Sequence, residues 1–220
     1  YQEKCLKSAE ELCKELEIEN YRYSFKEEFG ITLNELVEKS KIKENHAPPC
    51  TYCGILRRKL LNEKARELGI TKIATGHNLD DEIQASLMSY IRGDLDRIAR
   101  MGAMVGVVKD KKFIPRIKIL KECPENEVLQ YATLRGLKFV KGRCPYSEEA
   151  FRKTIREVID KIEERHPGSK FQLLRSTDQL IPIMRDRIKD KKIKKCKRCG
   201  DPSSGDICKF CQIREEFGLD

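Results

Sequence analysis

The chain has 220 residues, of which 39% are apolar and 37% charged, so it can form one sizeable core and a small appendage. No apolar run approaches the roughly 18 residues of a membrane span, and no basic stretch before an apolar one predicts a secretory signal. The net charge of +9 favours a polyanionic partner such as nucleic acid, although lysine-rich proteins also occur without one. Ten cysteines, six of them in C-x-x-C pairs, indicate intracellular metal binding or redox chemistry. We therefore expect a cytoplasmic protein with no membrane contact.

The first half of the chain alternates helical patterns with short strands. Apolar periodicity predicts helices over residues 1–16, 54–68 and 79–91, and strands over 18–25 and 72–75. Thr32 and Glu35 have the spacing of a capping box at the start of another short helix. Strand, turn and helix follow one another around Gly76, which is the unit of a parallel α/β sheet. Ligands bind such sheets at the carboxyl ends of their strands, where Gly76 lies.

The second half continues the α/β pattern and ends in a separate module. Pro115 cannot donate a ladder hydrogen bond, so residues 113–120 are expected to form an edge or irregular strand. The remaining elements are expected as helices from Pro124 to about Gly136, over 148–165 and over 169–192, and a strand over 137–140. We predict an α/β domain with a parallel sheet over residues 1–192 and a small metal-binding module over 193–220.

Four cysteines in the tail have the spacing of a structural zinc site. Two C-x-x-C pairs are separated by eight residues and consist of Cys196, Cys199, Cys208 and Cys211. Four thiolates suit tetrahedral zinc, and so short a loop cannot bury a core, so the metal would supply the folding energy. Two disulfides or free thiols are the alternative.

A second thiol pair is formed by Cys50 and Cys53, which alone could be half a zinc site or a redox pair. Cys144, followed by a proline, could complete a three-thiolate set. Three thiolates can hold a 4Fe-4S cluster and leave its fourth iron open to an external ligand. The spacing does not prove that Cys144 meets the pair, and it could instead be a small buried residue. The remaining thiols are interpreted as core or incidental residues: Cys5, Cys13 and Cys123.

The turn after the predicted strand at 72–75 carries several polar residues at a helix start. Asn78 as N-cap and acids in the first turn are explained by capping and by the helix dipole, which leaves Gly76 and His77 less well explained. Three adjacent acids disfavour phosphate unless Mg²⁺ intervenes. We therefore expect this turn to contact ribose, base or metal, or to supply a general base. The candidate cofactor-binding residues are Gly76, His77, Asn78 and Asp80.

Four segments, in this order, make the chain resemble a known family. They are Pro49-Cys50-x-x-Cys53-Gly54, Thr75-Gly-His-Asn-Leu-Asp-Asp81, Arg143-Cys144-Pro145-Tyr146 and the four-cysteine tail. Together they resemble the tRNA 2-thiouridine synthetases of the TtuA type, which are PP-loop ATP pyrophosphatases related to the cytidine-thiolating TtcA enzymes. The resemblance covers essentially the whole chain, and the tail favours the uridine branch.

The resemblance implies a mechanism, cofactors and partners. Such enzymes bind ATP, with Mg²⁺, adenylate the C2 oxygen of a tRNA uridine and let sulfur displace AMP. The cysteines matching Cys50, Cys53 and Cys144 hold a 4Fe-4S cluster whose free iron carries the sulfur. The acid matching Asp81 and a basic residue, here Arg57 or Arg58, are implicated in catalysis. The sulfur donor is a thiocarboxylated ubiquitin-like carrier protein or inorganic sulfide, and members often form homodimers.

The chain also departs from this family. A Ser-Gly-Gly-x-Asp-Ser phosphate loop and an amino-terminal zinc finger are not found in residues 1–220, and a helical pattern starts at Tyr1, as a truncated chain would. We therefore expect that these residues alone do not adenylate a substrate. The alternatives are a non-catalytic zinc-containing tRNA-binding module, a TtcA-like cytidine thiolase, or a redox protein that uses Cys50 and Cys53.

Overall fold

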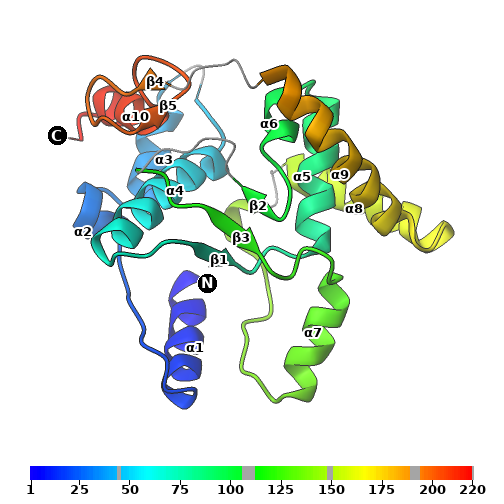
Figure 1. Ribbon diagram of the computed structural model, residues 1–220. Helices are drawn as coiled ribbons and strands as arrows, with labels where there is room; N and C mark the ends of the chain where they lie inside the picture. The colour runs from blue at the N-terminus through cyan, green and yellow to red at the C-terminus, as the bar shows by residue number, and fades with distance from the viewer. Residues whose placement is uncertain (44–45, 106–111, 148–150, 189–193, 220) are drawn as a thin grey trace.

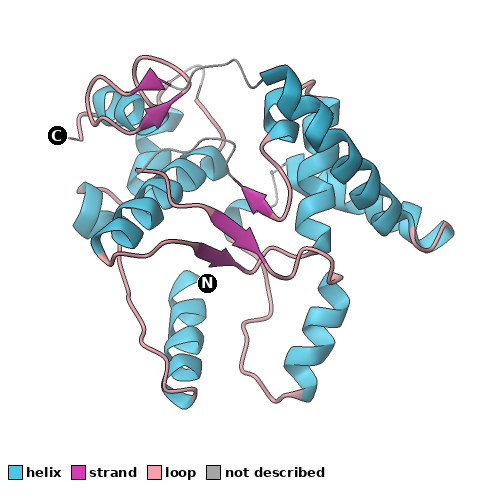
Figure 2. Cartoon of the chain, viewed as in Figure 1, coloured by secondary structure: helices cyan, strands magenta, loops and turns pink. Residues whose placement is uncertain are grey.

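The computed structural model describes residues 1–43, 46–105, 112–147, 151–188 and 194–219. Helices surround a small central sheet, and a unit of one helix and two short strands forms the C-terminal end (Figure 1). Helices make up most of the regular structure in this part of the chain (Figure 2). None of the described helices combines the length and the hydropathy that a membrane crossing requires.

The sheet contains β1 (Ile73–Thr75), β2 (Met104–Val105) and β3 (Arg116–Lys118) in the order β1-β3-β2. β1 and β3 are parallel, as predicted, whereas β2 runs antiparallel to β3. For residues 113–120 an edge or irregular strand was predicted, and the edge position is wrong, because β3 lies between the other two strands. Pro115 immediately precedes β3, where no donor is needed, and its carbonyl accepts a hydrogen bond of 2.9 Å from the Ile73 N–H.

Most predicted helices are confirmed, with small changes at their ends. The helices of the first half are α1 (Gln2–Glu15), α2 (Phe25–Phe29), α3 (Leu33–Lys41), α4 (Pro49–Glu67), α5 (Leu79–Ile91) and α6 (Leu95–Ala99). Those of the second half are α7 (Glu125–Leu134), the 3₁₀ turn η1 (Pro145–Ser147), α8 (Phe151–Arg165), α9 (Ser169–Ile188) and α10 (Lys209–Phe217). Parts of the predicted helices, residues 148–150 and 189–192, lie outside the described residues. The capping box of Thr32 and Glu35 is confirmed at the start of α3.

Two predicted strands are wrong. Residues 18–25 form no strand, because the Ser24 side chain accepts a hydrogen bond from the Glu27 N–H and starts α2 at Phe25. Residues 137–140 form none either, and the Lys138 carbonyl instead accepts a hydrogen bond of 2.7 Å from Ser8 of α1. The predicted core face of α1 is also wrong, since this helix buries no residue and its two cysteines are only half-buried.

Two apolar clusters hold the structure together. One joins Leu79 and Ile83 of α5 to Ile155 and Ile159 of α8 and to Leu174 of α9. The other joins α3 and α4 to the C-terminal unit, which consists of β4 (Lys194–Lys195), β5 (Pro202–Ser203) and α10.

In this second cluster the ring of Tyr52 meets that of Phe217 edge-on at 5.8 Å, and Phe29 lies 4.8 Å from Phe210 between ring centroids. The tail therefore packs against the helix that carries Cys50 and Cys53. A domain boundary near residue 192 stays a prediction, because the tail shares a core with α3 and α4.

Candidate functional site

Cys50 and Cys53 lie in the first turn of α4. The helix begins at Pro49, earlier than the predicted start at Gly54, because proline has no N–H to lose at a first helical position. The partial positive charge of a helix N-terminus favours thiolates at this place. The guanidinium of Arg57, one turn further on, donates a hydrogen bond of 3.5 Å to Cys53 Sγ.

Cys144 reaches this helix end from a distant part of the chain. It precedes η1, whose turn is closed by hydrogen bonds from the N–H and hydroxyl of Ser147 to the Cys144 carbonyl, at 2.8 and 2.6 Å. η1 packs against α4, and the Cys50 thiol donates to the Tyr146 carbonyl over 3.7 Å. Burial and the nearby charges of Cys144 and Cys53 raise the pKa of the Cys50 thiol. The structure thus brings the three predicted thiols to one place.

The kind of donor, three thiols, indicates which metal group Cys50, Cys53 and Cys144 could hold. Among the described residues, the tail cysteines form the one compact group of three or more ligand side chains that could hold a metal ion, and their sulfurs all lie within 4.8 Å of one another. Cys50, Cys53 and Cys144 do not form such a compact group. An all-thiolate set of three fits a 4Fe-4S cluster with one iron left open. The donor set fits the group implied by the resemblance.

The start of α5 carries a capping box and the predicted catalytic acid. Asn78 Oδ1 accepts from the Asp81 N–H at 3.0 Å, and Asp81 Oδ2 accepts from the Asn78 N–H at 3.3 Å. The other carboxylate oxygen of Asp81 lies 3.3 Å from Nη1 of Arg152, a residue of α8. The positive charge of Arg152 also acts on Cys50, whose pKa it lowers against the dominant effect of burial. Arg152 therefore connects the acid electrostatically to the cysteine site.

The other predicted residues of the turn have local roles. His77 is exposed, and its Nδ1 lies 2.9 Å from the Thr75 hydroxyl. A side chain added at Gly76 would meet nothing within 4 Å, so the turn is open to solvent at this place. Ligand contacts by Gly76, His77 and Asn78 stay predictions.

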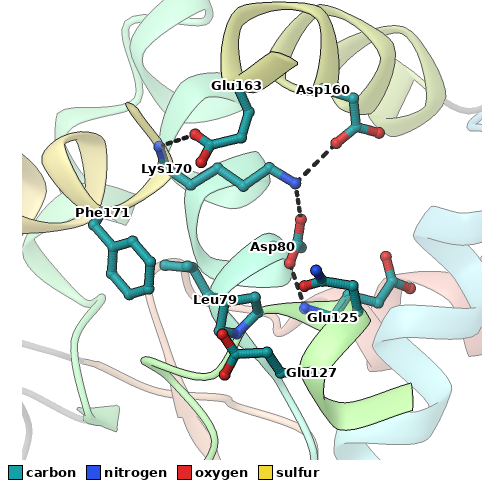
Figure 3. A pocket seen from close by; sticks show the side chains of 10 residues that line it. Leu79, Asp80, Glu125, Glu127, Asp160, Glu163, Lys170 and Phe171 are labelled. Carbon is teal, nitrogen blue, oxygen red and sulfur yellow. Dashed lines mark hydrogen bonds and ion pairs between the residues drawn. The ribbon is translucent and has the colours of Figure 1, made fainter. Parts of the chain in front are cut away.

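Asp80 points away from this site. Its carboxylate is only 4% exposed and accepts hydrogen bonds from Lys170 Nζ at 2.6 Å and from the Glu125 N–H at 2.7 Å. Figure 3 shows Lys170 between Asp80 and Asp160, at the edge of a largely acidic pocket of about 460 Å³. The carboxylate joins α5, α7 and α9, and its predicted cofactor-binding role stays a prediction.

Three further arginines act on residues of α4, and the sequence alone did not single them out: Arg116 Nη2 lies 3.4 Å from the Arg58 carbonyl, and the charges of Arg97 and Arg152 act on Arg58 and Cys50. Arg97 lies on α6, Arg116 on β3 and Arg152 on α8, so only the folded chain places them near one another. The Arg58 guanidinium folds back along α4, since a Cβ at Gly54 would lie 3.3 Å from its Nη1. Burial, followed by the charge of Arg97, lowers the pKa of Arg58.

The tail cysteines form a compact four-thiol site. The sulfurs of Cys199 and Cys208 lie 3.7 Å apart, farther than a disulfide bond of about 2.05 Å. Burial alone would raise the pKa of Cys196, but backbone N–H donors of Cys199, Cys208 and Arg198 outweigh it and lower the pKa to about 6. A thiolate stabilised in this way is the form that binds a metal.

The parallel β1–β3 unit, its helices and this site define an α/β protein of the HUP-domain type. The family described as "tRNA methyl transferase HUP domain" matches residues 1–141, which is more than half of the chain. The chain belongs to this family and, within it, to the tRNA 2-thiolation proteins.

Similar proteins and one solved structure support the assignment to the tRNA 2-thiolation proteins. The "tRNA 2-thiolation protein NcsA" of Haloferax volcanii is 37% identical over 99% of this chain and 69% of its own length. The "tRNA-5-methyluridine(54) 2-sulfurtransferase" of Pyrococcus horikoshii is 35% identical over 97% of this chain and 66% of its own length. The structure titled "U34-tRNA thiolase NcsA from Methanococcus maripaludis with its [4Fe-4S] cluster" matches with a TM-score of 0.79 and 36% identity, over 98% of this chain and 66% of that one. The chain thus spans about two thirds of the length of these proteins.

Proposed function

We propose that this protein is a tRNA sulfurtransferase that converts a uridine to 2-thiouridine. The main observation behind the proposal is that Cys53, Cys144 and Arg152 all act electrostatically on Cys50, and that Arg152 forms an ion pair with Asp81. The names of the relatives, which describe tRNA 2-thiolation and 2-sulfurtransfer, support the same reaction. They also favour uridine over the cytidine of a TtcA-like enzyme.

In the proposed reaction, ATP with Mg²⁺ first activates the uridine. The C2 oxygen bonds to the α-phosphorus, pyrophosphate leaves, and the N3 proton passes to Asp81, the acid of this turn that faces the cysteine site. The two neighbouring acids do not repel the phosphates strongly, because Lys170 neutralises Asp80 and Lys118 neutralises Glu82.

In the second step, sulfur replaces the C2 oxygen, which leaves with AMP. Arg57 or Arg58 stabilises the negative charge that develops on the leaving phosphate, since both belong to the cysteine end of α4. Cys50, Cys53 and Cys144 would hold a 4Fe-4S cluster. When bound, such a cluster supplies an iron without a protein ligand, on which a sulfur atom can be held.

The tail has a structural role in this proposal. Cys196, Cys199, Cys208 and Cys211 bind zinc and order the unit whose Phe217 packs on Tyr52 of α4. We further propose that the protein acts in the cytoplasm, as the name "Cytoplasmic tRNA 2-thiolation protein 1" of a Caenorhabditis elegans relative indicates for that protein. Sulfur supply by a thiocarboxylated carrier protein or by inorganic sulfide, and homodimer formation, stay predictions.

Metal analysis after anaerobic purification tests the proposal. We expect a brown protein with about four irons and one zinc per chain. Cys144→Ser should lose the colour and the iron but keep the zinc. The matched control is Cys13→Ser, because Cys13 is another half-buried thiol and lies on α1, where it accepts only from Asn20. Full iron in Cys144→Ser would exclude Cys144 from the site, and a colourless unsubstituted protein with zinc alone would indicate the non-catalytic tRNA-binding module.

The product of the reaction separates the remaining alternatives. Residues 1–220 contain no Ser-Gly-Gly-x-Asp-Ser phosphate loop, so the assay uses a chain that also carries this loop. Nucleoside analysis of tRNA treated with that chain, ATP and sulfide should show 2-thiouridine. The appearance of 2-thiocytidine would instead assign the protein to the cytidine branch.

A further inference from the structure

The turn that carries Cys144 has few connections to the rest of the protein. Two hydrogen bonds join residues 142–147 to other elements in the described part of the chain. In one, the Cys50 thiol donates to the Tyr146 carbonyl over 3.7 Å. In the other, the Tyr146 hydroxyl donates to Asn34 Oδ1 of α3 at 2.8 Å. The position of the turn therefore depends on a small number of contacts outside itself.

Of these two bonds, the one to Asn34 is independent of the protonation of the cysteines. A thiol that binds iron does so as a thiolate, because the ligand must first lose its proton. Cys50 therefore cannot donate to the Tyr146 carbonyl while it holds an iron. The hydroxyl of Tyr146 is not among the proposed iron ligands, so its hydrogen bond to Asn34 is available with and without a cluster.

Asn34 lies on a well-fixed part of the chain. It is the second residue of α3, and a capping box holds the first turn of this helix. Leu36 of the same helix is fully buried in the apolar cluster that it shares with Tyr52 of α4. Tyr52 lies between Cys50 and Cys53 in the sequence, so α3 is packed against the helix turn that carries these thiols. A hydrogen bond to Asn34 therefore fixes the distant turn relative to the same thiols.

We propose that Tyr146 and Asn34 are positioning residues, which hold Cys144 at the place where a cluster would bind. The inference rests on the proposed function, because it concerns the same three thiols. Each detachment of the turn from α3 would withdraw one of the three thiolates and leave iron accessible from solvent. Loss of the bond should raise the detached fraction about two- to tenfold, since the net contribution of a hydrogen bond corresponds to a factor of this size.

The rate at which an iron(II) chelator removes iron measures this detachment. The loss of the cluster absorbance is followed without oxygen in the cluster-loaded protein and in Tyr146→Phe, which keeps the ring and loses the hydroxyl. Asn34→Ala removes the acceptor, whereas Asn34→Asp keeps an oxygen that can accept. Tyr90→Phe is the matched control, because the Tyr90 hydroxyl donates a hydrogen bond of 2.9 Å to Thr177, between α5 and α9.

We expect Tyr146→Phe and Asn34→Ala each to release iron about two- to tenfold faster than the unsubstituted protein. The double variant should release iron no faster than either single variant, because both substitutions remove the same bond. Asn34→Asp should release iron at the unsubstituted rate. Tyr90→Phe should also do so, although it loses a hydrogen bond of the same kind.

Iron release from Tyr146→Phe at the unsubstituted rate would overturn the proposal and leave the thiolation function intact. Rate increases that multiply in the double variant would also overturn it, since the two residues would then act separately. An equal increase in Tyr90→Phe would have the same consequence, because iron release would then follow the stability of the whole protein. Failure of the unsubstituted protein to hold iron at all would instead contradict the proposed function.

Discussion

Two adjacent acids at the start of α5 should respond in opposite ways to the same substitution. Asp80 is nearly completely buried and ion-paired, whereas Asp81 has a side chain 32% exposed and pairs with Arg152, whose charge also acts on Cys50. We expect Asp80→Asn to reduce the free energy of unfolding strongly and thiolation weakly. We expect Asp81→Asn to abolish thiolation with little change in stability.

The magnitude for Asp80→Asn follows from its contacts. Removing one partner of a buried ion pair costs about 3–5 kcal/mol, because the other charge is left buried. Here Lys170 keeps a second partner, Asp160, at 2.9 Å, and the new amide oxygen can still accept from the Glu125 N–H. These two compensations reduce the expected loss to about 2–3 kcal/mol. Asp81→Asn keeps the capping geometry and loses only a half-exposed ion pair with Arg152, so its cost should be about 0.5–1 kcal/mol.

Urea unfolding of the cluster-loaded protein measures the stability of both variants. Thiolation is assayed with the same substitutions in a chain that also carries the phosphate loop. With a slope of about 2 kcal/mol per molar urea, the loss of about 2–3 kcal/mol in Asp80→Asn should lower the midpoint by about 1–1.5 M. Asp160→Asn is the control, because it removes the exposed partner of the same lysine, and it should shift the midpoint little. A stable Asp80→Asn protein that no longer binds ATP would refute this reasoning and would assign Asp80 to the cofactor.

Three further predictions concern other parts of the chain. Glu82→Gln should destabilise by about 3 kcal/mol in urea, because its partner Lys118 is only 11% exposed; a loss below about 1 kcal/mol would contradict a buried pair. Cys208→Ser should lose zinc and make the tail sensitive to limited proteolysis, whereas an intact, zinc-loaded tail would argue against this ligand set. Hydrogen bonds, first from the Thr32 backbone, hold the pKa of Glu35 at about 2, below its ordinary 4.5. The contribution of the Glu35 carboxylate to stability is therefore fully present above pH 4.5 and is lost as pH falls towards 2. Glu35→Gln should remove this part of the dependence of stability on pH. An unchanged dependence in the variant would disprove the prediction.

Signals that act within a few residues were readable from the sequence. Asn78 was predicted as the N-cap of α5, and the structure contains this hydrogen bond together with the reciprocal one to Asp81, which was not predicted. The helix after Cys50 was predicted too, although its start was placed at residue 54, where the apolar periodicity begins, and not at Pro49. The position of β3 depends on its neighbours in the sheet, so its own residues could not show that it is central.

The acids of α5 show why the site was harder to predict than the helix. In the sequence Asp80, Asp81 and Glu82 look like one acidic patch that would repel phosphate. Consecutive side chains on a helix point about 100° apart, so the three carboxylates reach different neighbours. They meet Lys170 of α9, Arg152 of α8 and Lys118 of β3. These partners come from segments far along the chain, so no local sequence pattern predicts them.

The same redistribution of charge bears on what the site can bind. Two of the three acids are neutralised by buried lysines, and the third shares its charge with Arg152. Arg58, Arg97 and Arg116 have no such partners in the described part of the chain. The local balance at the cysteine end of α4 is therefore positive, although the sequence of the α5 turn alone suggests the opposite. A positive balance at this place favours a polyanion whose phosphates approach the three thiols, and it would not favour a neutral substrate or a cation.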